Sequence, residues 1–324
     1  MKRILLVILT LSLLISGCLM GCSKENEYGN SGGRKNLGNS NSNSNSDNKT
    51  SSTEEIIETP IKYSEGLEYV LSTDRTYMVL AGMGTCKDTT IAIPPTYNDL
   101  PVKEITGGAF RPSLYESTPR VVEVIIPDSI IRIGGDAFRS CEHLSKVHIG
   151  RGVLEIGDDA FYNCSEPLNI FIKDMASFCN IKLTNFLGGH VKNEYNLYLN
   201  GELVEELIIP DSVTNIGDFI FSACISIKKV VLGKSVVSIG KYAFWNCKNL
   251  SEIAFNNSLN CIDTYAFTGC KILMKATFKN TSNWIITDNW SQDSKSLSSG
   301  ELANASTAAK YLADDYRSYK WERK

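Results

Sequence analysis

A short phrase of apolar and turn-forming residues recurs through the middle of the chain. Each copy has an isoleucine, a turn, and a phenylalanine followed three residues later by a cysteine. Successive copies are 23 residues apart, except for one interval of 60. A fixed period of this length predicts a solenoid in which every coil is one repeat. The copies read IRIGGDAFRSC at 131–141, LEIGDDAFYNC at 154–164, TNIGDFIFSAC at 214–224, VSIGKYAFWNC at 237–247 and NCIDTYAFTGC at 260–270.

A run of alternating polar and apolar residues follows the cysteine. The runs are KVHI, ELII, KVVL, EIAF and KATF. Alternation over four residues predicts a strand with one buried face. In stacked coils these strands form a parallel ladder with a spacing of about 4.8 Å. The side chains expected to point inward are Val147, Ile149, Leu207, Ile209, Val230, Leu232, Ile253 and Phe255.

Burial explains why the phrase repeats. One coil of 23 residues is too short to bury its own isoleucine, phenylalanine and cysteine, whereas stacked coils bury those of their neighbours. We therefore expect a solenoid of six or seven coils over residues 63–280, built mainly of strands, turns and short helices. Glycine follows the isoleucine in four coils, where we expect it to permit a tight turn. These residues are Gly134, Gly157, Gly217 and Gly240.

The ends of the solenoid and the long interval have their own patterns. The runs TYMVL and TIAI read as strands of an N-terminal cap. The interval of 60 indicates an insertion at about 173–203, with a short helix over DMASFCNI and a hairpin turning at Asn200–Gly201. This insertion is either part of a binding face or a decoration of its coil. Residues 281–324 form a C-terminal cap, with a helix from Ser306 to Lys320 that closes the last coil.

The repeat cysteines occupy one equivalent position that faces the core. An even number of cysteines in an exported protein invites a disulfide interpretation. Parallel Cβ vectors on neighbouring coils give poor disulfide torsions, however, so we interpret these residues as buried free thiols. They are Cys141, Cys164, Cys224, Cys247 and Cys270.

The N-terminus has the features of an export signal. Lys2 and Arg3 precede an apolar stretch, 4–15, that is too short to span a membrane comfortably. The sequence ISGCLMGCS follows, in which small residues precede cysteine twice. We expect a lipoprotein signal peptide over the first 17 residues, with Cys18 acylated and Cys22 as the alternative. An ordinary secretory signal is the other interpretation.

A polar tract separates this signal from the repeats. Residues 18–62 include NSNSNSNSDNKTSST and have few apolar side chains to bury. Such a composition predicts a flexible tether. Acylation would then hold the chain on a membrane surface, and the tether would carry the solenoid outward.

Composition and charge narrow the classes of function. The 324 residues carry a formal net charge of −3, which differs from the basic footprint of a nucleic-acid binder. Three histidines, His143, His148 and His190, occur in neither an HExxH motif nor a zinc-type spacing with cysteine. The adjacent acids Asp158 and Asp159 lie in a turn of the repeat, where solvated carboxylates are common. The sequence predicts no catalytic residue, metal site or cofactor.

The outward residues of the strands fall into two columns when the repeats are aligned. The first column alternates in charge over its second half, so neighbouring strands would form exposed ion pairs worth at most about 1 kcal/mol each. It contains Glu123, Lys146, Asn169, Glu206, Lys229, Glu252 and Lys275. The second column is more apolar than a solvent-facing column needs. It contains Ile125, His148, Phe171, Ile208, Val231, Ala254 and Thr277.

The apolar column is the candidate binding face for a macromolecular partner. We assign this role to its first five members, Ile125, His148, Phe171, Ile208 and Val231. The other interpretation is that β-branched residues stand here for strand propensity.

The repeated IPDS…IG..AF..C..L..V.I units over 121–278 resemble the BspA-type leucine-rich repeat of bacterial surface proteins. The resemblance extends to the segment 77–110, to the insertion and to LANASTAAKYL near the end. It implies a leucine-rich repeat solenoid, exported and lipid-anchored to the cell membrane or outer membrane. It also implies a non-catalytic role in adhesion to host matrix proteins, microbial surface proteins or glycans. A structural envelope role and a carbohydrate-binding or enzyme-associated role are the alternatives.

Overall fold

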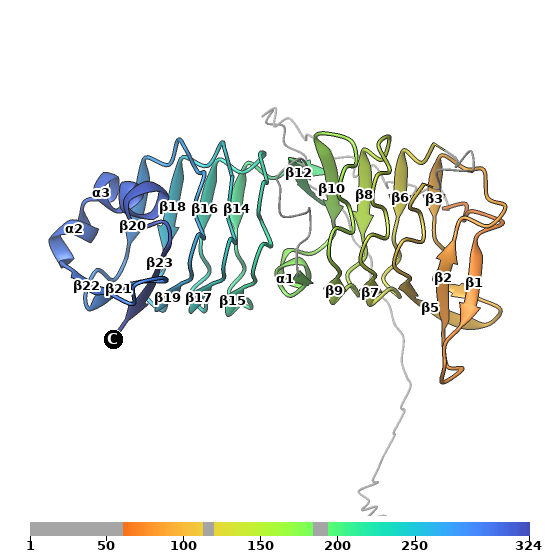
Figure 1. Cartoon of the computed structure of the whole chain (residues 1–324), viewed down its shortest axis with the longest axis horizontal. Coiled ribbons are helices and arrows are strands. Elements are labelled where there is room, and N and C mark those ends of the chain that lie inside the picture. Colours follow the sequence, from red (N-terminus) through yellow and green to blue (C-terminus); the bar gives the residue numbers. More distant parts are fainter. Residues whose placement is uncertain (1–60, 113–119, 184–193) are drawn as a thin grey trace, which may run out of the picture. The chain divides into compact units, whose positions relative to one another are not determined.

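Stacked coils with short strands on two sides make up the described part of the chain (Figure 1). This computed structural model describes residues 61–112, 120–183 and 194–324. The described residues belong to one compact unit. The expected signal peptide, the acylated Cys18 or Cys22, most of the tether and His190 lie outside the described residues.

The predicted strand ladder is present, but it is divided into two sheets. All its neighbouring strands pair in parallel, except for the antiparallel strand that ends the first sheet. The first sheet has the order β13(Glu202–Leu203), β12(Tyr195–Leu199), β10(Leu168–Ile172), β8(Lys146–Ile149), β6(Glu123–Ile125) and β3(Thr90–Ala92). The second has the order β14(Glu206–Ile208), β16(Lys229–Val231), β18(Glu252–Phe255) and β20(Lys275–Phe278).

The isoleucines of the phrase lie on a further set of short strands. One sheet contains β1(Glu68–Leu71), β2(Met78–Gly82), β5(Leu100–Ile105), β7(Arg132–Ile133), β9(Glu155–Ile156) and β11(Lys182–Leu183), with β4(Thr96–Tyr97) on β5. The other contains β15(Asn215–Ile216), β17(Ser238–Ile239), β19(Cys261–Ile262), β23(Tyr319–Arg323), β21(Trp284–Asp288) and β22(Ser294–Leu297). The helices are α1(Met175–Cys179), α2(Ser299–Ala303), α3(Ala305–Lys310) and the π-helix η1(Tyr311–Asp315).

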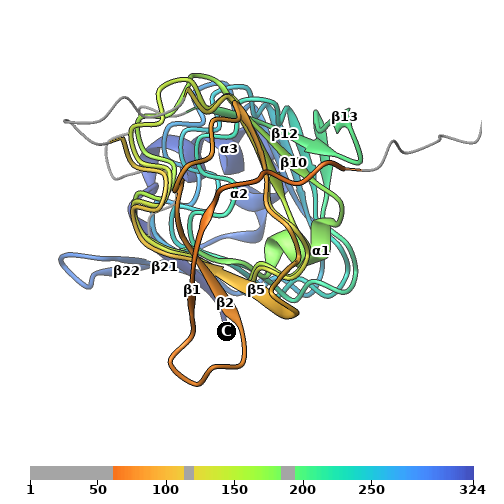
Figure 2. The same ribbon diagram turned by 90° about the vertical axis from the view of Figure 1, so that its right-hand side faces the viewer.

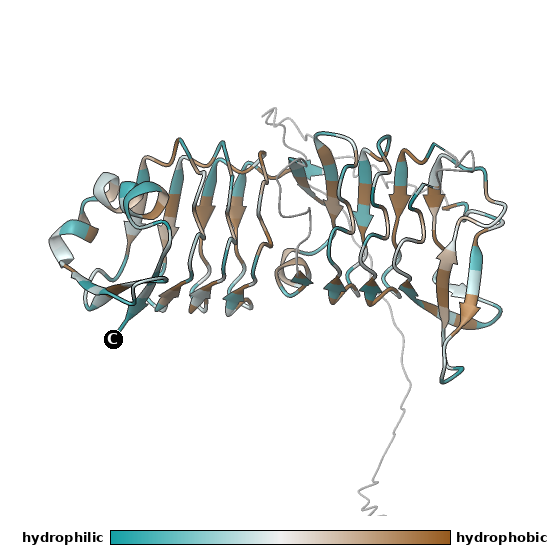
Figure 3. Cartoon of the chain, viewed as in Figure 1, coloured by the Kyte–Doolittle hydropathy of each residue, from teal (hydrophilic) through white to brown (hydrophobic). Residues whose placement is uncertain are grey.

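The core is a set of columns, each made of one position of the repeat. All eight strand residues predicted to point inward are buried. Hydrophobic and hydrophilic residues recur at equivalent places in successive coils (Figure 3). The phenylalanines stack face to face between coils, with ring centroids 4.6 to 5.3 Å apart. Their pairs are Phe110–Phe138, Phe138–Phe161, Phe221–Phe244 and Phe244–Phe267.

The repeat cysteines are free and buried, as the sequence predicts. The thiol of Cys247 donates a hydrogen bond to the carbonyl oxygen of Phe221 in the preceding coil, at 3.1 Å. Three other repeat cysteines donate in the same way to the carbonyl oxygen of the phenylalanine in the preceding coil. These pairs are Cys141 with Phe110, Cys164 with Phe138, and Cys270 with Phe244. This position therefore needs a residue that is small and apolar but can also satisfy a buried carbonyl group.

Burial should protect these thiols from alkylation. It raises the pKa of the Cys141 thiol to about 12 and that of Cys224 to about 11. Because the thiolate is the reactive species, we expect negligible labelling of these residues by a maleimide at pH 8. The half-buried Cys261 should react first among the described cysteines. Peptide mapping by mass spectrometry measures this order, and rapid labelling of Cys247 in the folded protein would contradict it.

The raised pKa values of the buried thiols also make the stability of the fold depend on pH. The folded state favours the neutral thiol, so this stabilisation is complete below the pKa of an unfolded thiol, about 8.5. It is lost as the pH rises toward 12, the value to which burial raises the pKa of Cys141. Unfolding midpoints measured from pH 8 to pH 11 should therefore fall progressively.

The glycines after the isoleucine let neighbouring coils approach closely. We expected them to permit a tight turn, but the left-handed backbone of that turn is found at other residues. None of the four has a positive φ. A Cβ on Gly157 would lie 2.5 Å from the backbone nitrogen of Gly135 in the preceding coil. The left-handed backbone falls two residues later, at Asp136 and Asp159, with φ of 57° and 55°. Gly217 has more space, because the nearest atoms to its Cβ would lie 3.7 Å away.

The insertion contains the predicted helix and hairpin, but it also adds a strand to the ladder. Helix α1 begins with an N-cap in which Asp174 accepts a hydrogen bond from the backbone of Ser177, at 2.6 Å. Strands β12 and β13 pair in antiparallel fashion about Asn200–Gly201, as predicted. β12 also pairs in parallel with β10 along its whole length. The outward columns read from the sequence go from β10 straight to β14, whereas β12 and β13 follow β10 in the first sheet and β14 lies in the second.

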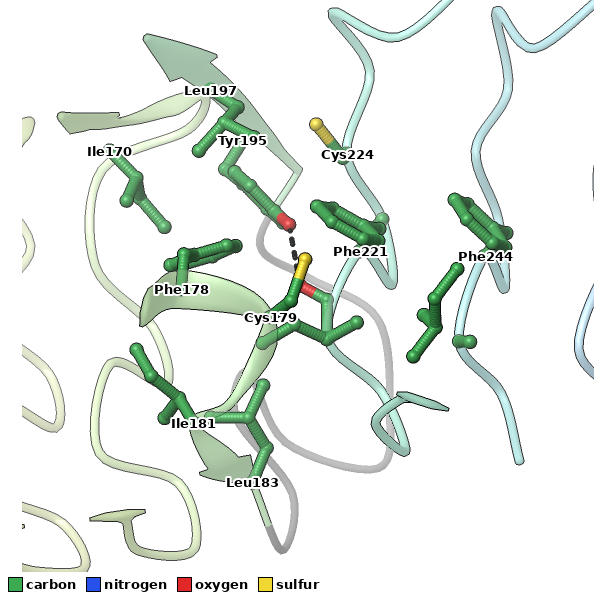
Figure 4. Close-up of a cluster of buried hydrophobic side chains, with 14 of the residues drawn as sticks. Ile170, Phe178, Cys179, Ile181, Leu183, Tyr195, Leu197, Phe221, Cys224 and Phe244 are labelled. Atoms are coloured by element: carbon green, nitrogen blue, oxygen red, sulfur yellow. Dashed lines mark hydrogen bonds between the residues drawn. The ribbon is translucent and has the colours of Figure 1, made fainter. Parts of the chain in front are cut away.

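Side chains of the insertion fill the core where the regular period is interrupted (Figure 4). Phe178 of α1 packs against Phe221 of the next regular coil, with ring centroids 5.9 Å apart. Tyr195 of β12 is fully buried, and its hydroxyl donates to the carbonyl oxygen of Ile220 at 3.1 Å. These contacts keep one hydrophobic core on both sides of the interruption.

At the C-terminus, the expected helix is shorter than the sequence suggested. Ala308 and Leu312 are buried, as predicted. The helical segment ends in η1, and Tyr319 begins strand β23 instead of completing a helix. The correction has a physical reason, because β19 would otherwise end its sheet with unpaired backbone groups, which a strand satisfies and a helix does not.

Two tryptophans close this end of the solenoid. β23 pairs with β19, opposing Trp321 to Ile262, and β21 pairs with β23. Trp284 and Trp321 are 0% and 1% exposed and pack edge to face. At the other end, the predicted strands TYMVL and TIAI correspond to β2 and β3.

Candidate binding groove

The outward residues of the first sheet form one apolar column. Ladder pairing places Ile125 opposite His148, His148 opposite Phe171, and Phe171 opposite Tyr198. Leu203 of β13 continues the column, because it pairs with Tyr198. The four residues from Ile125 to Tyr198 are half-buried, and Leu203 is exposed. Three members of the predicted binding face, Ile125, His148 and Phe171, therefore lie side by side.

The three aromatic rings of this column are stacked on one another. The centroids of His148 and Phe171 are 4.6 Å apart, and so are those of Phe171 and Tyr198. His148 is held from the neighbouring strand, because its Nε2 lies 2.8 Å from Oε1 of Glu123. Stacking and this contact fix the rings before any partner arrives, which lowers the conformational cost of binding.

An open groove of about 880 Å³ runs over three residues of this column, Ile125, His148 and Phe171. The N-terminal segment lines one part of it, with the exposed side chains of Ile61 and Tyr63. The turn of the β12–β13 hairpin, Asn200–Gly201, lines another part. The remaining lining residues are Ile93, Pro95, Ile125, Ile126, Pro127, Asp128, His148, Ile149, Gly150, Phe171, Ile172 and Lys173. A mainly apolar lining with a few polar groups is typical of a binding site.

The two remaining residues of the predicted face, Ile208 and Val231, lie outside the groove. They pair with each other in the second sheet. Ile208 is 63% exposed and is separated from Phe171 by the strands β12 and β13. The apolar column predicted from the sequence is therefore divided into two shorter columns, one on each sheet.

Sequence reasoning missed Tyr198 and Leu203 because it treated their segment as a hairpin outside the ladder. A signal was present. The alternation of YNLYL at 195–199 matches that of LNIFI at 168–172, which β10 contains.

The charged column behaves largely as predicted. Lys229 pairs with Glu206 and Lys275 with Glu252, each at 2.8 Å. Asn196 of the added strand donates to Asn169 at 3.1 Å, which continues the polar column across β12. These pairs are exposed, so each contributes at most about 1 kcal/mol to stability.

A charged cluster elsewhere in the described coils links two adjacent turns of the repeat. Arg139 bridges Asp136 and Asp159 at 3.1 and 2.6 Å, joining two adjacent turns. No group of three or more His, Cys, Asp or Glu residues in these coils is arranged to hold a metal ion. Nor does any helix among the described residues have the length and apolar character to cross a membrane.

Solved structures of bacterial leucine-rich repeat proteins are similar to this chain. A leucine-rich repeat protein of T. pallidum is 23% identical, and the match covers 68% of this chain and 83% of that one, with a TM-score of 0.37. A leucine-rich cell surface protein of Faecalibacterium prausnitzii is also 23% identical, with 73% of this chain and 61% of that one covered and a TM-score of 0.43. Among curated proteins, no relative matches this chain.

The repeats themselves match a family described as the BspA type leucine-rich repeat region. Six copies are found, over residues 108–188 and 193–310. These ranges contain the phenylalanine and cysteine columns, every strand of the two ladders except β3, and the groove-lining residues Ile125, His148 and Phe171. The chain belongs to the BspA-type leucine-rich repeat family.

Proposed function

We propose that this chain is a non-catalytic binding protein of the bacterial surface, and that the groove over Ile125, His148 and Phe171 binds a protein partner. The stacked rings of His148 and Phe171, which line the groove, are the observation that carries the proposal. A lipid on Cys18, with Cys22 as the alternative, and the polar tract after it would hold this surface away from the membrane.

The chemistry of the groove supports a protein partner. Its charged lining residues are Asp128 and Lys173, so the groove presents no strong field of either sign. Asp128 is also paired with Arg151 at 2.7 Å. Recognition would therefore depend on shape and on burial of aromatic side chains, which dominate the affinity of protein interfaces.

Substitution of Phe171 tests the proposal. We expect Phe171→Asp to weaken binding at least tenfold, which is about 1.4 kcal/mol, because it places a charge in the middle of the aromatic stack. Thr277→Asp is the matched control, since Thr277 occupies the equivalent outward position on β20 in the second sheet and is exposed. Binding of the full chain to purified host matrix proteins and to whole bacterial cells is measured by surface plasmon resonance and cell pull-down.

Circular dichroism shows whether both variants remain folded. A loss of binding with Phe171→Asp but not with Thr277→Asp supports the groove. Equal binding by the two variants would contradict it and move the site elsewhere. Failure of the unmodified chain to bind any member of the panel would favour a structural role in the cell envelope.

A further inference from the structure

Trp290 stands at the tip of the β21–β22 hairpin. It is 80% exposed, more than any other large hydrophobic residue that the structure describes. The hairpin extends beyond the stacked coils (Figure 2). Trp284 and Trp321 are buried in the same cap, so the exposure of Trp290 is not a property of the cap as a whole.

Backbone hydrogen bonds hold the turn that carries this ring. Oδ1 of Asp288 accepts from the backbone nitrogens of Trp290 and Ser291, at 2.7 and 2.8 Å. The backbone nitrogen of Asp288 donates to the carbonyl oxygen of Asp293, and that of Gln292 donates to the carbonyl oxygen of Asp288. The turn is therefore ordered by its own contacts. It presents the ring without needing support from the solenoid.

The exposed ring serves no packing purpose in this arrangement. Trp290 makes no ring contact with another aromatic residue and no cation–π contact within the described part of the chain. An indole carries a large apolar surface, and its exposure to water is unfavourable unless a ligand covers it.

We propose that Trp290 is the platform of a glycan-binding site that takes a neutral pyranose residue. A pyranose presents C–H groups on a face and hydroxyl groups around its rim. The C–H groups fit the electron-rich face of an indole. The hydroxyl groups fit the exposed amide, hydroxyl and carboxylate side chains around Trp290, which belong to Asn289, Ser291, Gln292 and Asp293.

The surroundings of the ring disfavour a protein partner and an anionic membrane surface. Protein hot spots lie within a patch that is desolvated on binding. Here the neighbouring residues of the turn are polar, as are the exposed Ser294, Lys295 and Ser296 of β22. The hairpin carries the carboxylates of Asp288 and Asp293 against the one ammonium group of Lys295, so its charge does not attract an anionic membrane surface. The site lies on the C-terminal cap and does not depend on the groove.

Tryptophan fluorescence gives a direct test, because Trp290 is the most exposed of the four tryptophans. The full chain is titrated with chito-, cello- and malto-oligosaccharides while acrylamide quenching is recorded. We expect at least one series to protect Trp290 from the quencher. Trp290→Ala should weaken this binding about tenfold or more, whereas Trp290→Tyr should retain most of it, since it keeps an aromatic face.

Met274→Ala is the matched control, since Met274 is 69% exposed outside the turn. It should bind as tightly as the unmodified chain. Phe171→Asp should also keep glycan binding, so this proposal and the groove proposal fail separately. The inference is overturned if none of the oligosaccharides binds, or if Trp290→Ala binds them as well as the unmodified chain does. Trp290-dependent binding to phosphatidylglycerol vesicles in place of oligosaccharides would overturn it as well.

Discussion

Replacement of Phe244 by alanine should lower the free energy of unfolding by about 3–5 kcal/mol. Its side chain is fully buried, and its ring stacks between those of Phe221 and Phe267, with centroids 5.3 Å away on each side. Alanine would remove both contacts and leave a cavity in the middle of the column. Because a solenoid coil is stabilised by its immediate neighbours, the loss acts on three coils together.

Urea denaturation followed by circular dichroism measures this effect. Leu154→Ala is the matched control, since it removes a large apolar side chain that is 60% exposed. Its free energy of unfolding should change by no more than about 0.5 kcal/mol. A loss below 1 kcal/mol for Phe244→Ala would show that the stacked column contributes little to stability.

Replacement of Gly152 by alanine should have the second largest effect, a loss of about 1–3 kcal/mol. A Cβ at this position would collide with the backbone carbonyl oxygen of Asp128 in the preceding coil. The nearest atoms all belong to the backbone, so no flexible side chain can move aside to make room. The coils would have to separate locally, which would disturb the parallel pairing of β6 with β8.

Gly300→Ala is the counterpart, because a Cβ there meets no atom within 4 Å and Gly300 lies in helix α2. Alanine is the better helix former, so this change should leave stability unchanged or raise it slightly. Thermal unfolding of the two variants in parallel tests the argument. An equal response of both glycines would mean that coil spacing is more adaptable than the structure indicates.

The repeat made the core predictable residue by residue. Since every coil stacks on the next, one position of the phrase meets the same environment in each coil. Phe138, Phe244 and Cys247 could therefore be placed in the core without knowledge of any distance. The buried free thiols followed from the same argument, because equivalent cysteines on stacked coils have parallel Cβ vectors.

Prediction was weaker where the chain leaves its period. The segment 195–199 satisfies the pattern of a hairpin and that of a ladder strand, and in the structure it is both. Its alternation matches that of β10, but the Asn200–Gly201 turn signal favoured a hairpin outside the ladder. As a result, Tyr198 was missing from the predicted apolar column, and Ile208 was aligned directly after Phe171.

The backbone conformation of the turns was also hard to predict from the sequence. Asp136 and Asp159 occupy the left-handed position in two coils, and such short polar residues tolerate it. Tyr242 and Tyr265 adopt it too, with φ of 57° and 62°, although aromatic residues rarely do. Their rings stack 5.0 Å apart, and this contact between coils offsets part of the cost of the backbone conformation.

By itself, the sequence determined the coil, its inward positions, the free thiols and the hairpin at Asn200–Gly201. The tertiary structure decided where the ladder divides, how β23 closes the last coil, and which outward side chains are neighbours. The physical reason is the range of the contacts. Those between equivalent positions of adjacent coils follow from a period of 23 residues, whereas the groove joins Ile61, Phe171 and Gly201 at separations unrelated to that period.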